Sequence, residues 1–297
     1  MGVEPEFVDD PRDERIADYV GLRDPQLRVS VEAAGETAGA PHGRFIVEGA
    51  LAVARLVGSS YPVRSVLIAD RRYRATEPLL AGLDPSVPRY VATQAILNTV
   101  AGFNLHRGVV ASAARLPWPQ PAEVLAAARR VLIIEGGVDH ENLGSLFRNA
   151  AAFGVDGVVL DPTCADPLYR RAVRVSMGHV LRMPIARSID LPATIRSMQT
   201  DGWVVLALTP SAVSVPLPAL PKAVLEPDAR VAVLVGAEGP GLTPGALDAA
   251  DLHVRIEMSD GVDSLNIATA AAIALHHLPH RSERSRPRRA RSPACEP

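Results

Sequence analysis

Apolar residues along the first part of the chain switch between two spacings. One repeats every three to four residues, which is typical of amphipathic helices, and the other is a short continuous or alternating run, which is typical of strands. Helical spacing covers 45 to 58 and 76 to 83, and strand spacing covers 63 to 70, 89 to 93 and 108 to 116. This pattern predicts a small α/β domain over residues 1 to 117.

A proline-rich break, PWPQP at 117 to 121, separates this series from a second one. We expect a linker with a short helix over 118 to 130 and a second domain over 131 to 280. In that domain strands are predicted at 131 to 136, 157 to 160, 203 to 209, 230 to 236 and 252 to 258, and helices at 142 to 153, 166 to 176, 191 to 199, 243 to 250 and 264 to 278. Short apolar strands separated by helices favour a parallel α/β sheet covered on both faces, with ligands at the carboxyl ends of the strands.

Charge is divided unevenly between the first 280 residues, called the body here, and the C-terminal tail. The formal net charge is −2, but residues 281 to 297 (RSERSRPRRARSPACEP) hold six arginines and two glutamates, which leaves 25 basic and 31 acidic groups, a net of −6, in the preceding 280 residues. The Pro/Ser/Arg-rich tail is predicted to be disordered. Binding of nucleic acid by the body must therefore rest on local patches, such as Arg71-Arg72-Tyr73-Arg74 and the run at 169 to 182.

Cysteine usage and hydropathy limit the class of protein. Cys164 and Cys295 match no metal-binding or redox spacing. Apolar runs around 45 to 58 and 265 to 275 are too short or too interrupted to span a bilayer, and the acidic N-terminus lacks the features of a signal peptide. We expect a cytoplasmic protein without structural disulfides and without a membrane partner.

Three stretches place glycines or polar residues directly after a predicted strand. The first, NLGSLFRNAAAFG at 142 to 154, is predicted to be an amphipathic helix whose polar face carries Ser145, Arg148 and Asn149, with Asn142 at its N-cap. On its own this pattern makes Arg148 an ordinary solvated charge.

The second stretch, VAVLVGAEGPGLTPG at 231 to 245, runs from a buried strand into Gly236, Glu238 and Gly241 and then into a helix. Glycines there let a ligand approach the backbone closely, although a glycine-rich turn explains them equally well. A dinucleotide-binding oxidoreductase needs G-x-G-x-x-G after its first strand, and this loop has neither that spacing nor that position. We therefore discount that class.

The third stretch, IEMSDGVDSLNIATAAAIALHH at 256 to 277, places Ser264, Leu265 and Asn266 at the start of an alanine-rich helix, where serine and asparagine are common caps. Near the end of that helix, His276, His277 and His280 have no carboxylate or cysteine partner in register. We predict no metal site.

In this order and at these spacings, the three stretches resemble the signature motifs of the SpoU (TrmH-type) branch of the SPOUT superfamily of RNA ribose 2′-O-methyltransferases. The matching positions are Asn142, Gly144, Arg148, Ala150, Phe153 and Gly154 in the first motif, Gly236, Glu238 and Gly241 in the second, and Met258, Ser264, Leu265 and Asn266 in the third. More loosely, the N-terminal half looks like the ribosomal-protein-like substrate-binding domain often attached to this family, with the most similar pieces at 45 to 56 and 106 to 111.

The resemblance implies a fold, a cofactor and partners. It implies a deep trefoil knot in the C-terminal α/β domain and a homodimer formed through that domain, with the active site near the subunit interface. It also implies that S-adenosylmethionine is held largely by backbone at Gly236, Ile256 and Leu265, with Thr209 beside them. The implied substrate is RNA, and the attached N-terminal domain favours ribosomal RNA over transfer RNA.

The resemblance also implies roles for five polar side chains. We expect Arg148 to bind the RNA phosphate and to stabilise negative charge developing on the ribose 2′-oxygen, because a guanidinium with a pKa above about 12 is a poor general base. Asn142 and Glu238 are expected to orient Arg148 and the ribose. Ser264 and Asn266 are expected to fix the third loop and to touch the substrate.

Two positions depart from the family pattern in the third motif. Glu257 stands where proline usually precedes the methionine, and Asp260 stands where glycine usually follows it, with Gly261 one step later. Carboxylates there would repel an RNA phosphate unless they point away. They leave open a methylation-incompetent RNA-binding or ribosome-assembly factor on the same fold. A transfer RNA methyltransferase and a self-protecting antibiotic-resistance methyltransferase also remain open.

Overall fold

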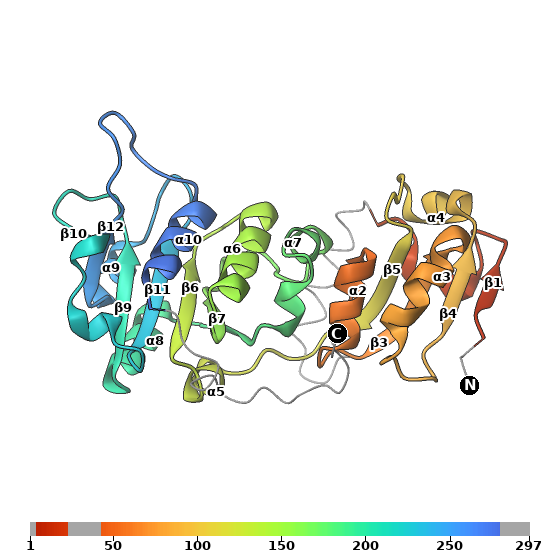
Figure 1. Cartoon of the computed structure of the whole chain (residues 1–297), viewed down its shortest axis with the longest axis horizontal. Coiled ribbons are helices and arrows are strands. Elements are labelled where there is room, and N and C mark those ends of the chain that lie inside the picture. The colour runs from red at the N-terminus through yellow and green to blue at the C-terminus, as the bar shows by residue number, and fades with distance from the viewer. Residues whose placement is uncertain (1–3, 23–42, 280–297) are drawn as a thin grey trace. The chain divides into compact units, whose positions relative to one another are not determined.

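The computed structural model describes residues 4 to 22 and 43 to 279, which form two compact units (Figure 1). The first unit contains the described residues up to Pro117 together with Pro167–Arg182. The second contains Trp118–Asp166 and the described residues from Met183 onward. Each unit is built around its own sheet.

The sheet of the first unit has five strands in the order β1-β4-β3-β5-β2. They are β1 (Glu6–Val8), β2 (Arg44–Glu48), β3 (Val63–Ala69), β4 (Arg89–Ala92) and β5 (Val109–Ala114). β1, β4 and β3 run parallel, whereas β5 is antiparallel to both β3 and β2. The carboxyl ends of β2, β3 and β4 therefore lie at the same edge of the sheet as the amino end of β5.

Helical segments pack against this sheet. The 3-10 helix η1 (Glu14–Tyr19) and α4 (Gln94–Ala101) contribute Ile16, Tyr19, Leu97 and Val100 to a core cluster with the strands. α2 (Ala50–Val57) packs on β2 and β5. After β3 the chain forms η2 (Asp70–Arg72), α3 (Tyr73–Thr76) and η3 (Glu77–Leu80). Further along the chain, α7 (Arg170–Val175) packs on β2, and η4 (His179–Arg182) packs on α2.

The helix predicted over 45 to 58 is wrong in its first part, where the chain forms β2. Phe45, Ile46 and Val47 are aromatic or β-branched and all are buried, as in a strand covered on both faces. Gly49, with φ of +98°, then separates the strand from α2. The helix predicted over 76 to 83 is also misplaced. The α-helical turn in this region, α3, ends at Thr76, and the chain continues from Glu77 to Leu80 as the 3-10 helix η3.

The sheet of the second unit has seven strands in the order β10-β12-β9-β11-β6-β7-β8. They are β6 (Arg130–Glu135), β7 (Gly157–Leu160), β8 (Ile185–Arg187), β9 (Trp203–Leu208), β10 (Val215–Pro216), β11 (Arg230–Gly236) and β12 (Leu252–Arg255). Every pairing in this sheet is parallel, which confirms the predicted parallel α/β sheet. All of the strands consequently end at one edge.

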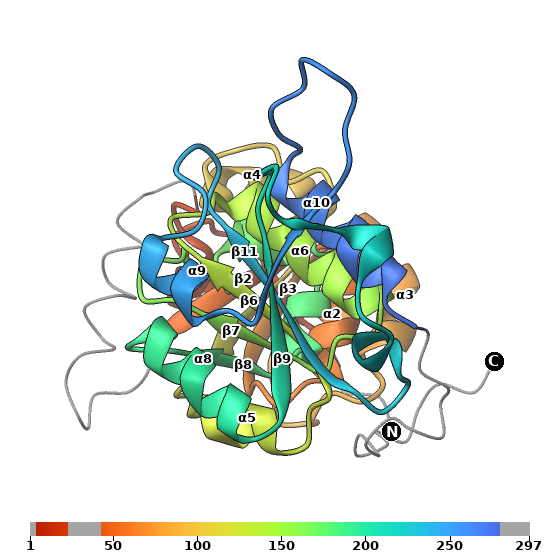
Figure 2. The ribbon, with the colours of Figure 1, turned by 90° about the vertical axis from the view of Figure 1, so that its left-hand side faces the viewer.

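Helices lie on both sides of the second sheet (Figure 2). α5 (Pro121–Ala126), α8 (Leu191–Thr200) and α9 (Pro244–Ala249) share a buried apolar cluster with the strands on one side. α6 (His140–Ala152) and α10 (Ile267–His277) pack against each other, and α10 also packs on β11. This double cover explains why the central strands are apolar on both faces, since β6 is buried at every position. Two further 3-10 turns, η5 (Leu217–Ala219) and η6 (Lys222–Leu225), follow β10.

The division into units differs from the predicted domains in two places. The segment predicted as a linker, 118 to 130, contains α5, which buries Val124 and Leu125 and packs on β7 and β8. The segment Pro167–Arg182 clusters with the first unit although it was predicted within the second domain. An ion pair of 2.6 Å between Arg170 and the buried carboxylate of Glu48 helps to hold it there.

Two helix starts also differ from the predicted ones. Asp139, rather than Asn142, is the N-cap of α6, and its carboxylate accepts hydrogen bonds from the backbone of Glu141 at 2.6 Å and Asn142 at 3.0 Å. Asn266 caps α10, so that helix begins at Ile267 and Ser264 remains in the preceding loop.

No helix within residues 4 to 22 and 43 to 279 has both the length and the apolarity needed to cross a membrane. The tail predicted to be disordered, at 281 to 297, and His280 lie outside the described residues.

Candidate functional site

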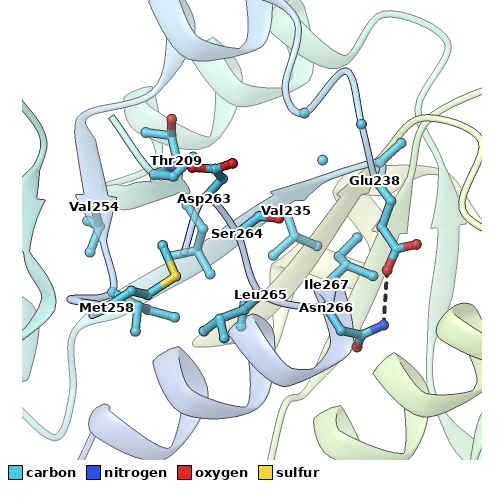
Figure 3. A pocket seen from close by; sticks show the side chains of 18 residues that line it. Thr209, Val235, Glu238, Val254, Met258, Asp263, Ser264, Leu265, Asn266 and Ile267 are labelled. Carbon is cyan, nitrogen blue, oxygen red and sulfur yellow. Dashed lines mark hydrogen bonds between the residues drawn. The ribbon is translucent and has the colours of Figure 1, made fainter. Parts of the chain in front are cut away.

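A pocket of about 670 Å³ opens at the carboxyl ends of β9, β11 and β12 (Figure 3). Its volume lies within the range of about 300 to 1,000 Å³ typical of small-molecule sites. The lining residues are Leu208, Thr209, Pro210, Val235, Gly236, Ala237, Glu238, Gly239, Gly241, Val254, Ile256, Met258, Asp263, Ser264, Leu265, Asn266, Ile267 and Ala270. The pocket thus lies at the sheet edge where a parallel α/β fold places its ligands.

The loop after β11 folds tightly back on itself and forms one wall of this pocket. The backbone of Gly241 donates to the carbonyl of Ala237 at 3.0 Å. A Cβ at Gly236 would lie 2.4 Å from the carbonyl carbon of Gly241, closer than two such atoms can approach. Gly236 is therefore required by the turn itself, in addition to any approach of a ligand.

A buried carboxylate anchors the far end of the same loop. Glu135, the last residue of β6, is 6% exposed. Its two oxygens accept hydrogen bonds from the backbone N–H of Thr243 at 2.8 Å and from the Thr243 hydroxyl at 2.7 Å. Thr243 in turn caps α9. Sequence reasoning missed Glu135, although a carboxylate ending an otherwise apolar strand is a signal of a buried polar partner.

Three of the predicted residues form a hydrogen-bonded cluster beside the pocket. Asn266 donates from Nδ2 to Oε1 of Glu238 at 2.9 Å and to Oδ1 of Asn142 at 2.7 Å. Asn142 donates from Nδ2 to the same Glu238 oxygen at 3.1 Å and to Asp139 at 2.8 Å. Figure 3 shows the bond between Glu238 and Asn266 at the pocket wall. The structure therefore brings together one residue from each of the three stretches, and Asp139 is a member that sequence reasoning missed.

Arg148 lies apart from this cluster. It is exposed on α6, six positions beyond Asn142, which turns its side chain by about 120° around the helix axis from that of Asn142. It does not line the pocket. Within residues 4 to 22 and 43 to 279, no side chain forms a hydrogen bond or ion pair with it. Asn142 and Glu238 make no hydrogen bond to Arg148, because their hydrogen bonds join them to each other and to Asn266. Their role in orienting Arg148 stays a prediction.

The remaining predicted residues all line the pocket. Thr209 follows β9, Ile256 follows β12, and Ser264 and Leu265 come from the loop that precedes α10. Backbone and small side chains at three strand ends can enclose a flat ligand while leaving its polar groups to the loops.

The carboxylates of the third stretch point to different places. Glu257 is exposed, lies 3.8 Å from Arg255 and does not line the pocket, and Asp260 is exposed and outside the lining as well. Asp263 does line it, and Figure 3 shows it beside Thr209, across the pocket from Glu238. Neither residue that departs from the family pattern therefore lines the pocket, whereas Asp263, to which sequence reasoning gave no role, does.

The Cys164 thiol of the second unit is buried and hydrogen-bonded outside the pocket. Burial raises the pKa of the Cys164 thiol, which hydrogen-bonds the carbonyls of Ile134 and Gly136. A thiol held in this way is a poor nucleophile at neutral pH. In the part of the chain that the structure describes, no group of three or more His, Cys, Asp and Glu side chains is placed to hold a metal ion.

The second unit is thus a parallel α/β ligand-binding domain with its pocket at the strand ends and an amide and carboxylate cluster at the pocket wall. A model of the SpoU rRNA Methylase family matches residues 129 to 276, which span this pocket and cluster. The chain belongs to this family of RNA methyltransferases, which confirms the family predicted from the three stretches.

Relatives extend the similarity beyond the matched region. An uncharacterized tRNA/rRNA methyltransferase of Mycobacterium tuberculosis is 45% identical over 277 residues, covering 93% of this chain and 92% of the relative. The 23S rRNA (guanosine(2553)-2′-O)-methyltransferase of Bacillus subtilis is 28% identical, covering 79% of this chain and 88% of the relative.

Solved structures agree with the fold. An AdoMet-bound rRNA methyltransferase from Sinorhizobium meliloti superposes with a TM-score of 0.72 at 21% identity, covering 92% of this chain and 97% of that one. The SpoU methyltransferase AviRb from Streptomyces viridochromogenes, in complex with AdoMet, gives a TM-score of 0.66 at 20% identity, covering 86% of this chain and 97% of that one. At this level of identity the likeness establishes the fold alone.

Proposed function

We propose that the protein methylates a ribose 2′-hydroxyl of ribosomal RNA with S-adenosylmethionine as the methyl donor. The observation that carries the proposal is the pocket at three strand ends whose wall contains the Asn142, Glu238 and Asn266 cluster, in a chain of the SpoU family. The B. subtilis relative supports it, because that protein is named for 2′-O-methylation of 23S rRNA.

The pocket fits S-adenosylmethionine in size and in charge. Val235, Val254 and Ile267 offer apolar contact for an adenine ring, and Thr209, Gly236, Ile256 and Leu265 supply backbone around it. Asp263 and Glu238 offer carboxylates to a ligand that carries positive charge. When bound, this cofactor supplies a methyl group on a cationic sulfur that can be transferred to an oxygen.

Glu238 is positioned to bind the ribose. Both amides of the cluster donate to its Oε1, and none of the described residues donates to its Oε2. That second oxygen is available to accept from a ribose hydroxyl. Held by two donors, the carboxylate keeps one orientation, and fixed geometry is a large part of what methyl transfer requires. Ser264, exposed at the same pocket, adds a hydroxyl for contact with the substrate.

Arg148 supplies a positive charge for the RNA in this proposal. In the reaction the 2′-oxygen forms a bond to the methyl carbon, the carbon–sulfur bond breaks, and the hydroxyl proton leaves to phosphate or water. A guanidinium stabilises the negative charge that develops on the oxygen and forks onto phosphate. Because Arg148 lies outside the pocket of its own chain, we propose that it meets the ribose in a homodimer whose active sites lie near the subunit interface.

Three further features complete the proposal. We propose that the C-terminal domain contains the trefoil knot of the SPOUT superfamily, that it forms the homodimer, and that the first unit binds the RNA substrate. We also propose that the protein works in the cytoplasm.

The proposal is tested by incubating the protein with labelled S-adenosylmethionine and in vitro transcribed, unmodified ribosomal and transfer RNA, followed by nucleoside analysis. A 2′-O-methylated nucleoside from ribosomal RNA is the expected product, and the modified position is then mapped. Label in a base contradicts the ribose assignment, and label in transfer RNA alone contradicts the choice of substrate. Cofactor binding by calorimetry without methylation of either RNA would favour a methylation-incompetent RNA-binding factor.

A further inference from the structure

Loops from three strands meet at one edge of the first sheet and are tied together by their backbones. The backbone N–H of Ala69, at the end of β3, donates to the carbonyl of Gly108 at 2.7 Å. The N–H of Gly49, after β2, donates to the carbonyl of Val109 at 2.8 Å. The segments after β2 and β3 and the one before β5 thus form a fixed platform.

Three arginines project from this platform. Arg71 and Arg72 follow β3, and Arg107 precedes β5, so residues 35 positions apart become neighbours through strand pairing. Arg107 lies over Gly49, where its Cδ is 2.8 Å from the position of a Cβ, and Arg72 lies over Gly108, where its Cγ is 3.1 Å from that position. Both glycines have positive φ, so glycine gives the arginine stems their room.

A network of amides orients one of the three. Arg71 donates from Nη2 to Oε1 of Gln94 at 2.9 Å. The Gln94 Nε2 donates to Oδ1 of Asn98 at 2.9 Å and to the carbonyl of Leu105 at 3.0 Å, which fixes the direction of its oxygen. The Arg71 guanidinium is therefore aimed by residues of α4 and the following loop.

The three guanidiniums are not neutralised by nearby carboxylates. All three residues are exposed, and none forms an ion pair with a residue in 4 to 22 or 43 to 279. Asp70 uses its carboxylate on the backbone N–H of Arg71 at 2.6 Å, and the buried Glu48 is paired with Arg170 at 2.6 Å. The edge keeps a local positive charge in a chain whose first 280 residues are net acidic.

We propose that Arg71, Arg72 and Arg107 form a phosphate-binding surface that holds the RNA backbone against the first unit. The inference rests on the proposed function in taking RNA as the partner. Guanidinium forks match phosphate oxygens in geometry, and unpaired exposed arginines gain affinity by releasing counterions from the nucleic acid. Such contacts position the RNA without reading its sequence.

The test compares the full-length protein with two triple variants. One removes the surface (Arg71→Ala, Arg72→Ala, Arg107→Ala), and the matched control removes three exposed arginines elsewhere (Arg64→Ala, Arg129→Ala, Arg196→Ala). Arg64 stands at the other end of β3 from Arg71, about 20 Å away along the strand, and it differs from the surface arginines in being ion-paired with Asp18 at 3.0 Å. Labelled, unmodified 16S and 23S ribosomal RNA transcripts are the probe in filter binding across salt concentrations.

We expect the surface variant to lose affinity by about tenfold or more and to flatten the slope of log affinity against log salt by about 2 to 3, while the control stays near the wild-type slope. In methylation assays its KM for RNA rises while kcat at saturating RNA and cofactor affinity stay the same. Equal affinity and slope in wild type and surface variant overturn the inference even if the protein methylates RNA, and so does a wild type that binds neither transcript. Salt-dependent binding through the arginines without 2′-O-methyl product leaves the surface standing and removes the methyltransferase proposal.

Discussion

Two sheet edges of this protein gather loops in the same way but carry opposite chemistry. In the second unit, the ends of β9, β11 and β12 enclose a pocket whose charged lining residues are Glu238 and Asp263. In the first, the loops at the end of β3 and the start of β5 carry Arg71, Arg72 and Arg107. Strand order decides which loops meet, and the residues in those loops decide the sign of the ligand that fits.

The two edges also differ in how their polar groups are held. Glu238 accepts from two amide donors, one of which caps α10, so the groups of the pocket wall are hydrogen-bonded to one another without a ligand. Arg72 and Arg107 have no hydrogen-bond partner among the described residues and lie on the platform by packing alone. We therefore expect steep, geometry-dependent effects at the pocket and graded, salt-dependent effects at the arginine edge.

The largest effect is expected from Arg148, the arginine proposed to stabilise negative charge on the 2′-oxygen during methyl transfer. Arg148→Ala should lower kcat for methyl transfer by about 10²- to 10³-fold, as loss of one transition-state donor does elsewhere. Calorimetry should give unchanged affinity for S-adenosylmethionine, because Arg148 does not line the pocket. Arg196→Ala, an exposed arginine on α8, is the matched control. A folded Arg148→Ala protein with wild-type methyl transfer would remove this residue from the mechanism.

The next effect concerns the shape of the pocket rather than its charge. A methyl group at Gly236 meets backbone of Gly241 at 2.4 Å, so Gly236→Ala must displace the loop at a cost of about 1 to 3 kcal/mol. If that cost falls on the bound state, affinity for the cofactor drops by about 5- to 150-fold. The control is Gly137→Ala, where no atom lies within 4 Å of the added carbon. Calorimetry on both variants decides, and equal affinity in the two would show that the loop accommodates the change.

Sequence patterns could predict the pocket edge of the second unit better than the arginine edge of the first unit. Asn142, Glu238 and Asn266 follow three parallel strands, β6, β11 and β12, and parallel strands end at one edge, so the predicted sheet accounts for their meeting. The same reasoning places Arg148 at that edge beside Glu238 and Asn266, but its position on α6 turns it away from them. Arg107 is different, because it joins Arg71 only through the antiparallel pairing of β3 with β5, which the apolar pattern does not reveal. Strands as short as β8 and β10 carry too few residues for any period to show.

In loops, no repeating spacing of apolar residues indicates which way a side chain points, so the sequence could not predict which loop residues face the pocket. Glu257, Asp260 and Asp263 lie within seven residues of one another, yet only Asp263 among them lines the pocket. The first residue of α6 could not be predicted for a similar reason. Asp139 and Asn142 are both good N-cap residues, and the choice between them depends on where β6 ends.

A smaller effect should separate those carboxylates. Asp263→Asn removes a negative charge from the pocket and should weaken binding of S-adenosylmethionine by about tenfold, which corresponds to about 1.4 kcal/mol. Asp260→Asn makes the same change on the same loop outside the lining and should leave affinity unchanged. Repeating the titration with S-adenosylhomocysteine, which lacks the sulfonium charge, shows whether Asp263 meets that charge or the ammonium. Equal affinities for wild type and Asp263→Asn would mean that the pocket does not select its ligand by charge at this position.

The smallest effect should show that the cap of α10 and the pocket wall are one structure. Asn266 accepts from the backbone of Ala268 and Thr269 while donating to Glu238 and Asn142. Asn266→Ala should lower the free energy of unfolding by about 1 kcal/mol, measured from urea midpoints, as loss of an N-cap does. Asp190→Ala removes the cap of α8 and should cost a similar amount. The difference lies in function, because only Asn266→Ala also releases Glu238, so it alone should raise the KM for RNA or lower kcat. Matching losses of activity in both variants would reduce Asn266 to a helix cap.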